Sequence, residues 1–411
     1  MKRRVVITGL GVVSPIGNGI EKFQDAIYAG KSGVGKITAF DASEFTSKIA
    51  GQVNDFEASD YLSSKEVRRS DRFVQFAIAA ASMAVKDSKI DLQSVDPYRV
   101  GSVIGSGIGG IHTIERDHKI LLEKGPSRIS PFFIPMLIVN MASGMVAIKL
   151  GAKGPNSCSV TACASSNHSI GEAFRIIQNN YADVMFGGGS EAAITPMGIG
   201  GFCAAKALST RNDEPEKASR PFDNDRDGFI MAEGSGIVML EEYEHAKKRD
   251  ASIYAELIGY GMSCDAYHMT APDPSGSGAI RCMQDSISDA GLNPKDVDYI
   301  NAHGTSTKLN DAVETKAIKA VFGGHAKKLA ISSTKSMTGH MLGAAGGAEL
   351  ASSCLTIKNG IIPPTINYEI PDPDCDLDYV PNKSRKQKVN VAISNSLGFG
   401  GHNAALIIRK I

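Results

Sequence analysis

Short apolar runs alternate with helix-spaced apolar residues along the chain, and this alternation restricts the fold more than any other feature. The runs that we expect to form strands are 5–9, 100–104, 183–189, 236–240, 253–258, 297–301, 329–332, 389–394 and 404–408. The segments that we expect to form helices are 21–29, 73–86, 282–290, 312–321 and 345–358, besides the stretch after residue 163. This pattern predicts two doubly wound α/β sheets packed together, with helices between and outside them.

The same rhythm occurs twice, which predicts one half at 1–250 and another at 251–411. The run 5–9 is expected to end at its glycine, and residues 30–70, rich in Gly, Ser and Asp, are expected to be loop-like. Segment 209–229 is polar and too long for an idle loop in a compact domain, so we expect an ordered functional cap there. Binding sites of open α/β sheets lie at the carboxyl ends of the strands, so we expect functional residues in the loops that follow the strands.

The charge balance excludes several classes of protein. The 411 residues contain 44 Lys+Arg and 44 Asp+Glu, which argues against a nucleic-acid binder and against a membrane-seeking surface. No apolar run approaches the roughly 20 residues that span a bilayer, and the N-terminus lacks the apolar core of a signal peptide. The seven cysteines form no CxxC pair and no zinc-like cluster with histidine. We therefore expect a cytoplasmic protein with free thiols.

One cysteine stands where the sequence changes from strand-like to helix-like. Residues 159–161 are β-prone, and a helical pattern begins directly after Cys163. The apolar positions of that pattern are Ile170, Ala173, Phe174 and Ile177. A helix N-terminus favours an anion, so the sequence predicts that the thiolate of Cys163, its reactive form, is favoured. A buried core cysteine is the competing interpretation.

Three further strand ends carry small residues and side chains that can do chemistry. His303 lies in 301–307, His340 in 334–347, and Phe399 in the glycine-rich turn 394–403. A lone histidine is more often structural, because imidazole has many hydrogen-bonding uses. One cysteine and two histidines at strand ends together indicate a site with a thiol nucleophile.

A glycine run, 105–110, follows the expected strand 100–104 and matches the G-x-G-x-x-G pattern of dinucleotide sites. No strand ending in an acidic residue follows about 20 positions later, where such sites place the partner of the ribose. The sequence there is Ser-Pro-Phe-Phe-Ile-Pro. We interpret these glycines as positions where the backbone crowds a pocket.

The chain resembles the β-ketoacyl-[acyl-carrier-protein] synthases, most closely the type II condensing enzymes of dissociated fatty-acid synthesis. Thr-Ala-Cys, Ala-His-Gly-Thr-Ser-Thr, Lys-Ser-x-x-Gly-His and Gly-Phe-Gly-Gly occur in the family's order, and the similarity runs from residue 5 to the last strand. The resemblance implies the thiolase-like fold, two pseudo-duplicated α/β halves in a layered α-β-α-β-α core, and a homodimer. It also implies a decarboxylating Claisen condensation of malonyl-acyl-carrier-protein with a cysteine-bound acyl chain. No cofactor is implied besides the 4′-phosphopantetheine of the acyl carrier protein that carries the substrates.

The resemblance assigns the chemistry residue by residue. Cys163 matches the nucleophile, and neutral imidazoles of His303 and His340 would stabilise the enolate that forms as carbon dioxide leaves. The backbone N–H groups of Cys163 and Phe399 match the oxyanion hole. Lys335 matches a supporting lysine, which we expect to be held by an acid such as Asp311 or Glu314.

Other positions match the family's binding surfaces. Thr305 and Thr307 match the threonines that contact the phosphopantetheine arm. The expected acyl-pocket residues are Ile108, Phe202, Phe399 and Phe133, the last reaching across a dimer. The expected carrier-protein docking residues are Lys65, Arg68, Arg69, Arg128 and Lys206. No metal is required, but some members hold a monovalent cation at the positions of Asn301, Glu349, Ser394 and Asn395. Core packing and solvated charge are the competing interpretations for the pocket and docking residues.

Four alternatives bear on function. A thiolase should carry a second cysteine in the C-terminal glycine-rich turn, which here holds Phe399 and no cysteine. A non-catalytic chain-length partner of polyketide synthases should lack the nucleophile, and Cys163 is present. An NAD-dependent oxidoreductase rests only on the glycine run. A polyketide ketosynthase uses the same residues on carrier-bound substrates and stays open.

Overall fold

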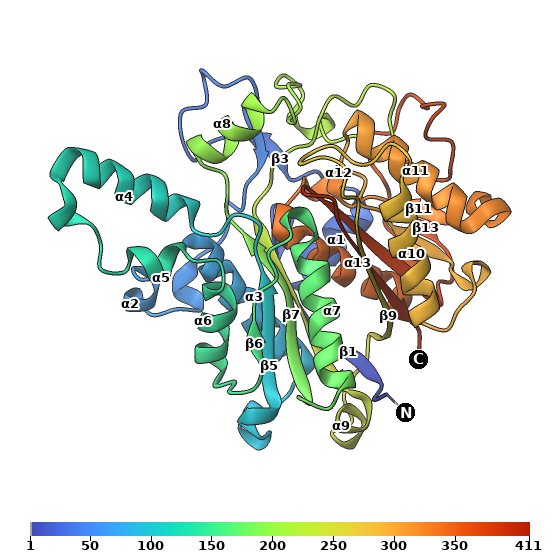
Figure 1. Ribbon diagram of the computed structural model, residues 1–411, viewed down its shortest axis with the longest axis horizontal. Coiled ribbons are helices and arrows are strands. Elements are labelled where there is room, and N and C mark those ends of the chain that lie inside the picture. The colour runs from blue at the N-terminus through green and yellow to red at the C-terminus, as the bar shows by residue number, and fades with distance from the viewer. Residues whose placement is uncertain (1) are drawn as a thin grey trace.

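The computed structural model describes residues 2–411 and contains one large sheet (Figure 1). Within each half the strands, counted along the chain, follow the same order from the outer edge of the sheet to its middle. The order is β11-β10-β14-β15-β9-β1-β8-β7-β5-β6. The first-half strands on this path are β1 (Val5–Ser14), β5 (Val100–Gly105), β6 (Asn156–Ser157), β7 (Val184–Glu191) and β8 (Gly234–Glu242). Those of the second half are β9 (Ala255–Cys264), β10 (Tyr299–Asn301), β11 (Ala330–Ser332), β14 (Val391–Gly398) and β15 (His402–Arg409).

The two halves share directions as well as order. In the first half, β5 is parallel to β6 and β7, and β8 is antiparallel to β7 and β1. In the second half, β10 is parallel to β11 and β14, and β15 is antiparallel to β14 and β9. Antiparallel pairing of β1 with β9 joins the halves. The expected duplicated α/β architecture is confirmed, whereas the division between residues 250 and 251 stays a prediction.

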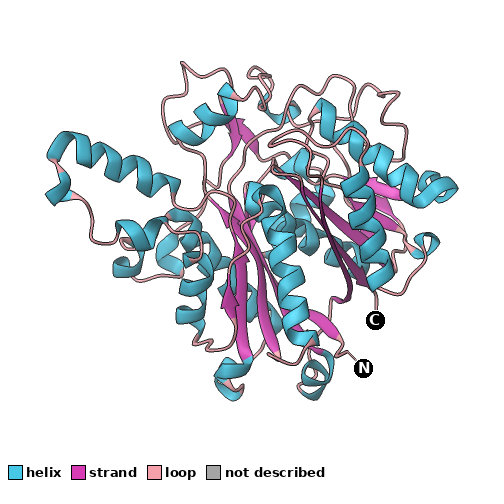
Figure 2. Ribbon diagram, in the orientation of Figure 1, coloured by secondary structure: helices cyan, strands magenta, loops and turns pink. Residues whose placement is uncertain are grey.

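Helices lie in three layers around the two halves of the sheet (Figures 1 and 2). Helices α7 (Ser165–Gln178) and α13 (Ala345–Asn359) contact each other and strands of both halves, so they form the middle layer. α3 (Arg72–Ser88) and α6 (Met141–Leu150) cover the outer face of the first half, and α10 (Ser277–Asp289) covers the second. In α13 all residues from 345 to 357 are buried, and most of them are small, as a helix enclosed between sheets requires.

The remaining elements are short or peripheral. The further helices are α1 (Ile20–Ala29), α2 (Ser64–Val67), α4 (Ile111–Lys124), α5 (Phe133–Leu137), α8 (Pro196–Ala204), α9 (Tyr243–Lys248), α11 (Lys308–Phe322) and α12 (Lys335–Thr338). The further strands are β2 (Gly17–Asn18), β3 (Val34–Lys36), β4 (Ile49–Gly51), β12 (Ile361–Ile362) and β13 (Arg385–Lys386). None of the helices in residues 2–411 is both long and apolar enough to cross a membrane.

The expected end of the first strand at Gly9 is wrong. Strand β1 continues to Ser14, with a register shift between Ile7 and Gly9. A Cβ at Gly9 would lie 2.3 Å from the carbonyl oxygen of Ala84 in α3, and one at Gly11 would lie 1.8 Å from that of Ala80. These glycines therefore let a helix approach the strand closely instead of ending it.

The expectation of a loop over 30–70 is also only partly right. The segment contains the two-stranded sheet β3–β4 and helix α2, which starts with a capping box between Ser63 and Glu66. The sequence reasoning also missed α4, α6 and α8. Of these helices, α8 contributes Phe202 to the wall of the cavity described below.

Candidate active site

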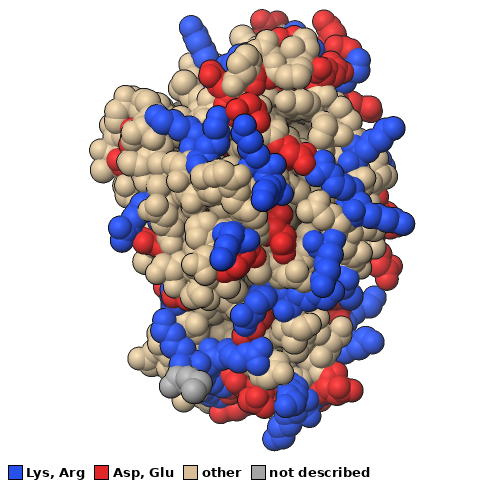
Figure 3. Space-filling model, turned by 90° about the vertical axis from the view of Figure 1, so that its right-hand side faces the viewer, with Lys and Arg blue, Asp and Glu red and all other residues tan. Residues whose placement is uncertain are grey.

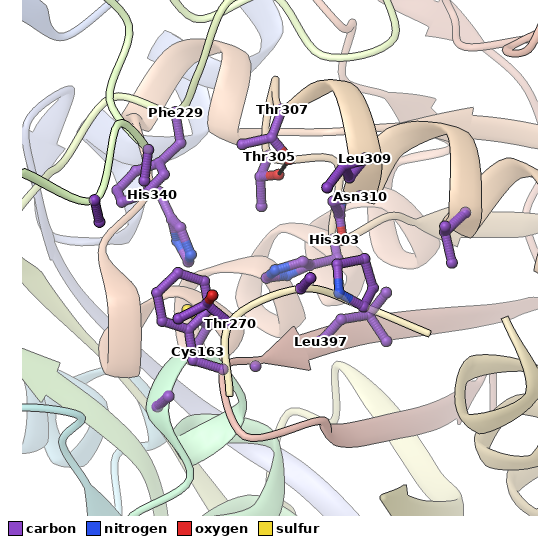
Figure 4. A pocket seen from close by; sticks show the side chains of 18 of the residues that line it. Cys163, Phe229, Thr270, His303, Thr305, Thr307, Leu309, Asn310, His340 and Leu397 are labelled. Atoms are coloured by element: carbon purple, nitrogen blue, oxygen red, sulfur yellow. Dashed lines mark hydrogen bonds between the residues drawn. The ribbon is translucent and has the colours of Figure 1, made fainter. Parts of the chain in front are cut away.

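A cavity of about 550 Å³ lies where strand-end loops of the two halves meet. The predicted residues that line it are Ile108, Cys163, Phe202, Lys206, His303, Thr305, Thr307, His340 and Phe399. Figure 4 shows the side chains of Cys163, His303 and His340 facing one space, with Thr305 and Thr307 at its border. The cysteine comes from the first half and both histidines from the second, so the site requires both halves.

Cys163 lies in a tight turn that starts α7. The predicted strand over 159–161 is wrong, because these residues belong to no strand. A 3₁₀ turn, Ala162–Ala164, precedes the helix, and Ala162 has a φ of 49°, a strained value for a non-glycine residue. Ser165 holds the turn: its Oγ accepts from Thr161 N at 2.9 Å and donates to Ala162 O at 2.7 Å. The turn thus presents Cys163 at the N-terminus of the helix.

The thiol of Cys163 is protonated in the resting site. Burial raises the pKa of Cys163 to about 12, while the charge of Lys335 and the N–H groups of Phe399 and of Cys163 itself oppose that rise. The expectation that the helix N-terminus would favour the thiolate is therefore wrong for the free protein. Desolvation of the anion outweighs the dipole when the side chain is enclosed. The sulfur needs a base when it reacts.

The backbone N–H groups of Phe399 and Cys163 both point toward the Cys163 sulfur. Strand β14 can come this close because its last residue is a glycine. A Cβ at Gly398 would lie 3.3 Å from Cys163 N and 3.2 Å from Ala164 N. Two N–H groups beside a thiol form an arrangement that can stabilise an oxyanion.

Two neutral imidazoles face the thiol. The ligand atoms of Cys163, His303 and His340 all lie within 4.8 Å of one another, and the two rings are 5.3 Å apart at 84°. Burial, and then the charge of Lys335, holds the pKa of His303 and of His340 well below the usual 6.5. Neutral imidazoles in this position can donate an N–H to a carbonyl or accept a proton from sulfur.

Lys335 fixes the orientation of His303. Its ammonium lies 3.3 Å from His303 Nδ1 and forms a buried ion pair with Glu349. The expected acid, Asp311 or Glu314, was wrong. Because an ammonium only donates, His303 Nδ1 must accept and its Nε2 carries the proton. That tautomer and the nearby positive charge also disfavour a metal ion between Cys163 and the histidines, although their spacing would permit one.

Buried carboxylates hold the loop that carries His303. Glu314 accepts from His303 N and from Gly304 N, both at 2.8 Å. Asp311 accepts from Thr305 N at 2.9 Å. The hydroxyls of Thr305 and Thr307 lie 2.9 Å apart at the cavity wall. The first turns of α11 therefore set the backbone of the loop and, with it, the histidine and both threonines.

Glu191 is a residue of the candidate site that the sequence reasoning missed. This buried carboxylate at the end of β7 accepts from Gly107 N at 2.7 Å, Ile108 N at 3.1 Å and Gly343 N at 3.0 Å. The N–H groups of Gly107 and Ile108 are thus already bonded to a buried carboxyl group and are not free to bind the pyrophosphate of a dinucleotide. The run instead positions Ile108 at the cavity, as the crowded-backbone interpretation predicted. Only the contact across the fold reveals the role of Glu191.

The four residues predicted around a monovalent cation leave oxygen atoms without partners. Asn301 Oδ1, Glu349 Oε2, Ser394 Oγ and Asn395 Oδ1 are buried and have no hydrogen-bond partner within residues 2–411. Carbonyl, hydroxyl and carboxylate oxygens are the ligands of hard cations. Unsatisfied buried oxygens are costly, so this donor set fits a bound cation.

The chain alone does not gather the remaining predicted residues. Phe133 starts α5 and is not among the cavity residues. All five predicted docking residues are exposed, but Lys65, Arg68 and Arg69 lie at α2, far in Figure 1 from Lys206 beside α8. The guanidinium of Arg69 stacks on Phe132 at 4.3 Å. Figure 3 shows both signs of charge interspersed on the face at the right of Figure 1, consistent with the balanced composition.

Comparison with known proteins identifies the family. Residues 2–246 match the model of the beta-ketoacyl synthase N-terminal domain, and residues 254–369 match that of its C-terminal domain. The 3-oxoacyl-[acyl-carrier-protein] synthase 2 of Coxiella burnetii is 58% identical over 100% of this chain and 99% of its own. The protein of that name from Synechocystis is 55% identical over 100% of this chain and 98% of its own.

Solved structures agree. A type II polyketide ketosynthase bound to a hexaketide, in complex with its acyl-carrier protein, gives a TM-score of 0.92 at 40% identity over 100% of both chains. A beta-ketoacyl synthase from Burkholderia phymatum gives 0.93 at 34% identity, also over 100% of both chains. The thiolase-like architecture expected from the motifs is therefore confirmed. The chain belongs to the β-ketoacyl synthase family.

Proposed function

We propose that the chain is an acyltransferase that condenses malonyl-acyl-carrier-protein with a Cys163-bound acyl chain, giving 3-oxoacyl-acyl-carrier-protein and carbon dioxide. This is the elongation step of type II fatty-acid synthesis. The observation that carries the proposal is the meeting of one thiol and two neutral imidazoles within 4.8 Å in a single cavity. Full-length identity of 54–58% to 3-oxoacyl-[acyl-carrier-protein] synthase 2 proteins supports it.

In the first step, the sulfur of Cys163 attacks the carbonyl carbon of an acyl thioester. A new carbon–sulfur bond forms, and the bond to the pantetheine sulfur breaks. The N–H groups of Cys163 and Phe399 stabilise the oxyanion of the tetrahedral intermediate. The thiol proton passes to a neighbouring imidazole and from there to the departing pantetheine thiolate, since the pKa of Cys163, about 12, keeps the thiol protonated until then.

In the second step, the malonyl thioester enters with its carbonyl oxygen between His303 and His340. Their N–H groups stabilise the enolate as the bond to the carboxylate breaks and carbon dioxide leaves. The enolate carbon attacks the acyl carbonyl, the carbon–sulfur bond to Cys163 breaks, and the departing thiolate takes up a proton from water, since loss of carbon dioxide from a carboxylate consumes one proton. Neutral rings suit this role, because a neutral imidazole can donate a hydrogen bond from its N–H to the enolate oxygen without transferring the proton.

Lys335 and Glu349 act through His303, whose tautomer the ammonium sets. Thr305 and Thr307 bind the phosphopantetheine arm at the cavity wall. Ile108, Phe202 and Phe399 form the acyl pocket, and Phe133 completes it across a homodimer. These assignments rest on the match to the family motifs and on the positions described above.

The surroundings of the reaction belong to the same proposal. The acyl carrier protein docks on Lys65, Arg68, Arg69, Arg128 and Lys206, a set that two copies of the chain would have to assemble. A monovalent cation binds among Asn301, Glu349, Ser394 and Asn395. Seven free cysteines support a reducing cytoplasm as the compartment.

A polyketide ketosynthase is the second candidate, because one such enzyme superposes with a TM-score of 0.92. The higher identity to the fatty-acid condensing enzymes favours the first proposal. The two differ in their products. With excess malonyl-carrier, a fatty-acid enzyme should release the chain after one condensation, whereas a polyketide enzyme extends the unreduced 3-oxoacyl chain again.

The test is a reconstituted reaction of an acyl-carrier-protein thioester with malonyl-carrier, followed by mass spectrometry of the carrier. One two-carbon extension with release of carbon dioxide is expected. Repeated extension without a reductase would support the polyketide candidate. Absence of any extension by the folded protein would overturn both.

A further inference from the structure

Arg226 lies in the polar insertion 209–229, and its side chain is only 2% exposed. Its Nε donates to Thr307 O at 3.1 Å, and one terminal nitrogen donates to Lys308 O at 3.1 Å. The other terminal nitrogen donates to Asp223 O at 2.7 Å. All three guanidinium nitrogens therefore hold backbone carbonyls, two of them in the loop that carries Thr307.

Two carboxylates balance the buried charge. Asp372 accepts from Arg226 at 2.5 Å, and Asp311 lies 3.6 Å from Arg226 Nε. Asp311 also accepts from Thr305 N, at 2.9 Å. The guanidinium thus touches the threonine loop directly at one end and, through Asp311, at the other. A buried ion pair by itself contributes little to stability, so the backbone that this guanidinium holds in place is a better explanation for it.

The loop between the two threonines would not hold its shape unaided. Ser306 has a φ of 68°, in the left-handed region that a non-glycine residue enters at a cost. Its carbonyl accepts from Gly228 N at 3.1 Å, again from the insertion. The insertion therefore fixes the turn that brings the hydroxyls of Thr305 and Thr307 to 2.9 Å from each other at the cavity wall.

We propose that Arg226 is a positioning residue for substrate binding: it holds the Thr305–Lys308 backbone so that both threonine hydroxyls meet the pantetheine arm. This inference rests on the proposed function and extends it to Arg226, whose hydrogen bonds go to Thr307, Lys308, Asp223 and Asp372 and not to the thiol or either imidazole. Loss of the guanidinium should weaken binding of the arm while the chemistry at Cys163 proceeds. The effect should therefore appear in KM rather than in kcat.

Arg220 provides a matched control within the same insertion. It is also 2% exposed, but its guanidinium donates to Asn367 O at 3.3 Å and to Glu369 at 2.8 Å. Its Nε lies 3.2 Å from the carboxylate of Asp223, whereas Arg226 binds the backbone carbonyl of that residue. Its one contact with the threonine loop is made by its backbone N–H, on Ser306 Oγ at 3.0 Å, and survives a side-chain replacement. Replacing Arg220 removes a buried charge without releasing Thr307.

The experiment compares Arg226→Gln, Arg226→Lys and Arg220→Gln with the natural chain. Four quantities are measured: KM and kcat for malonyl-carrier, the affinity for free pantetheine by calorimetry, and the rate of Cys163 alkylation by iodoacetamide. For R226Q we expect KM to rise about tenfold, with kcat within about threefold and alkylation unchanged. R226K should fall between, because an ammonium keeps the charge but cannot reach three carbonyls. R220Q should keep the natural KM.

Several results would overturn the inference. One is a KM for R226Q equal to that of R220Q, which would leave Arg226 a purely structural residue. Another is slower alkylation in proportion to the KM change, which would mean that the whole site had collapsed. If R226Q does not fold, R226K decides, and a natural KM and pantetheine affinity there would contradict the inference. Pantetheine affinity needs no turnover, so it separates failure of this inference from failure of the proposed function, which an inactive natural chain would reveal.

Discussion

The two halves of the molecule share one strand order and one way of starting a middle helix, yet only one of the two equivalent helix starts carries a cysteine. Helix α7 follows a 3₁₀ turn in which Ala162 has a φ of 49°, and α13 follows one in which Leu342 has a φ of 48°. The next residue is Cys163 in the first half and Gly343 in the second. The duplicated backbone therefore provides two equivalent positions, and only the first-half position carries a reactive side chain.

The second-half turn is used for packing. Gly343 N donates to Glu191 at 3.0 Å, and a Cβ at Gly343 would lie 2.4 Å from Gly107 N. The second half instead supplies its reactive groups from loops outside the helix start, at His303 and His340. The fold therefore determines where a side chain can act, whereas the residue at that position determines what chemistry it can do.

The largest expected effect is at the occupied turn. Cys163→Ala should lower condensation by a factor on the order of 10⁴ or more, because Cys163 is the only thiol among the described residues that line the cavity. The assay is formation of 3-oxoacyl-carrier, with circular dichroism as the control for folding. Condensation at more than a hundredth of the natural rate would mean that the first-half turn is not where the acyl chain is held.

The second-half loops can be tested apart from the nucleophile. Cys163→Gln, which mimics an acylated thiol, should still release carbon dioxide from malonyl-carrier. Adding His303→Ala or His340→Ala should lower that release by about 100- to 1000-fold, the usual cost of one donor to a developing oxyanion. Carbon dioxide release is measured directly. Undiminished release in the double variants would remove the histidines from the reaction.

The packing role of the second-half turn predicts a stability effect. Gly343→Ala should lower the free energy of unfolding by about 1–3 kcal/mol, since its Cβ would meet Gly107 N and, at 2.8 Å, Glu191. Gly144→Ala in α6 is the control: its Cβ would meet only Met141, at 3.9 Å, so a gain of about 0.5–1 kcal/mol is expected. Denaturant unfolding measures both. Equal effects at the two glycines would contradict the packing role.

The pH dependence should reflect the environment of the second-half histidines. Burial and Lys335 lower the pKa of His303 and of His340 well below 6.5, so both stay neutral as the pH falls through that value. Decarboxylation by the Cys163→Gln variant should therefore have no acid limb near pH 6.5. Unfolded imidazoles do bind protons there, so each histidine's contribution to the free energy of unfolding should decrease as the pH falls below 6.5.

That stability term can be isolated with His340→Asn. The natural chain should lose stability relative to this variant below pH 6.5, by up to about 1.4 kcal/mol per pH unit. Urea unfolding at several pH values measures the difference. A constant difference from pH 5 to 8 would show that His340 titrates alike in the folded and unfolded chains.

The smallest expected effect concerns the cation. The four oxygens belong to Asn301 at the end of β10, Glu349 in α13, and Ser394 and Asn395 in β14. Potassium should raise the thermal midpoint by a few degrees over tetramethylammonium at equal ionic strength, because a large organic cation cannot enter the site. Asn395→Ala should abolish the difference. An equal midpoint in both salts would leave the oxygens unexplained.

The sequence was sufficient for the groups that local pattern places at strand ends. Cys163, His303, His340 and Phe399 were predicted there, and all of them line one cavity. His303, His340 and Phe399 follow β10, β11 and β14, which are parallel neighbours, so their proximity followed from position along the chain. The strand predicted before Cys163 is absent, and the start of α7 places this residue instead.

Residues that act through contacts across the fold were not predictable in this way. Glu191 lies in no recognisable local motif, yet its carboxyl group joins the glycine run to Gly343, 152 positions away. Lys335 pairs with Glu349 of α13. Which acid would pair with this lysine could not be predicted, because it depends on how α13 packs against the loop that carries Lys335. The pKa of Cys163 depended on enclosure by both halves, which a helix-terminus argument alone does not contain.

The most direct test of the division of labour between the halves is intact-protein mass spectrometry with peptide mapping. The natural chain is mixed with an acyl-carrier-protein thioester and then with malonyl-carrier. We expect an acyl adduct on Cys163 alone that is discharged when malonyl-carrier is added, and an adduct that persists in His303→Ala. An adduct on another residue, or none on the folded protein, would contradict the assignment of Cys163 as the nucleophile.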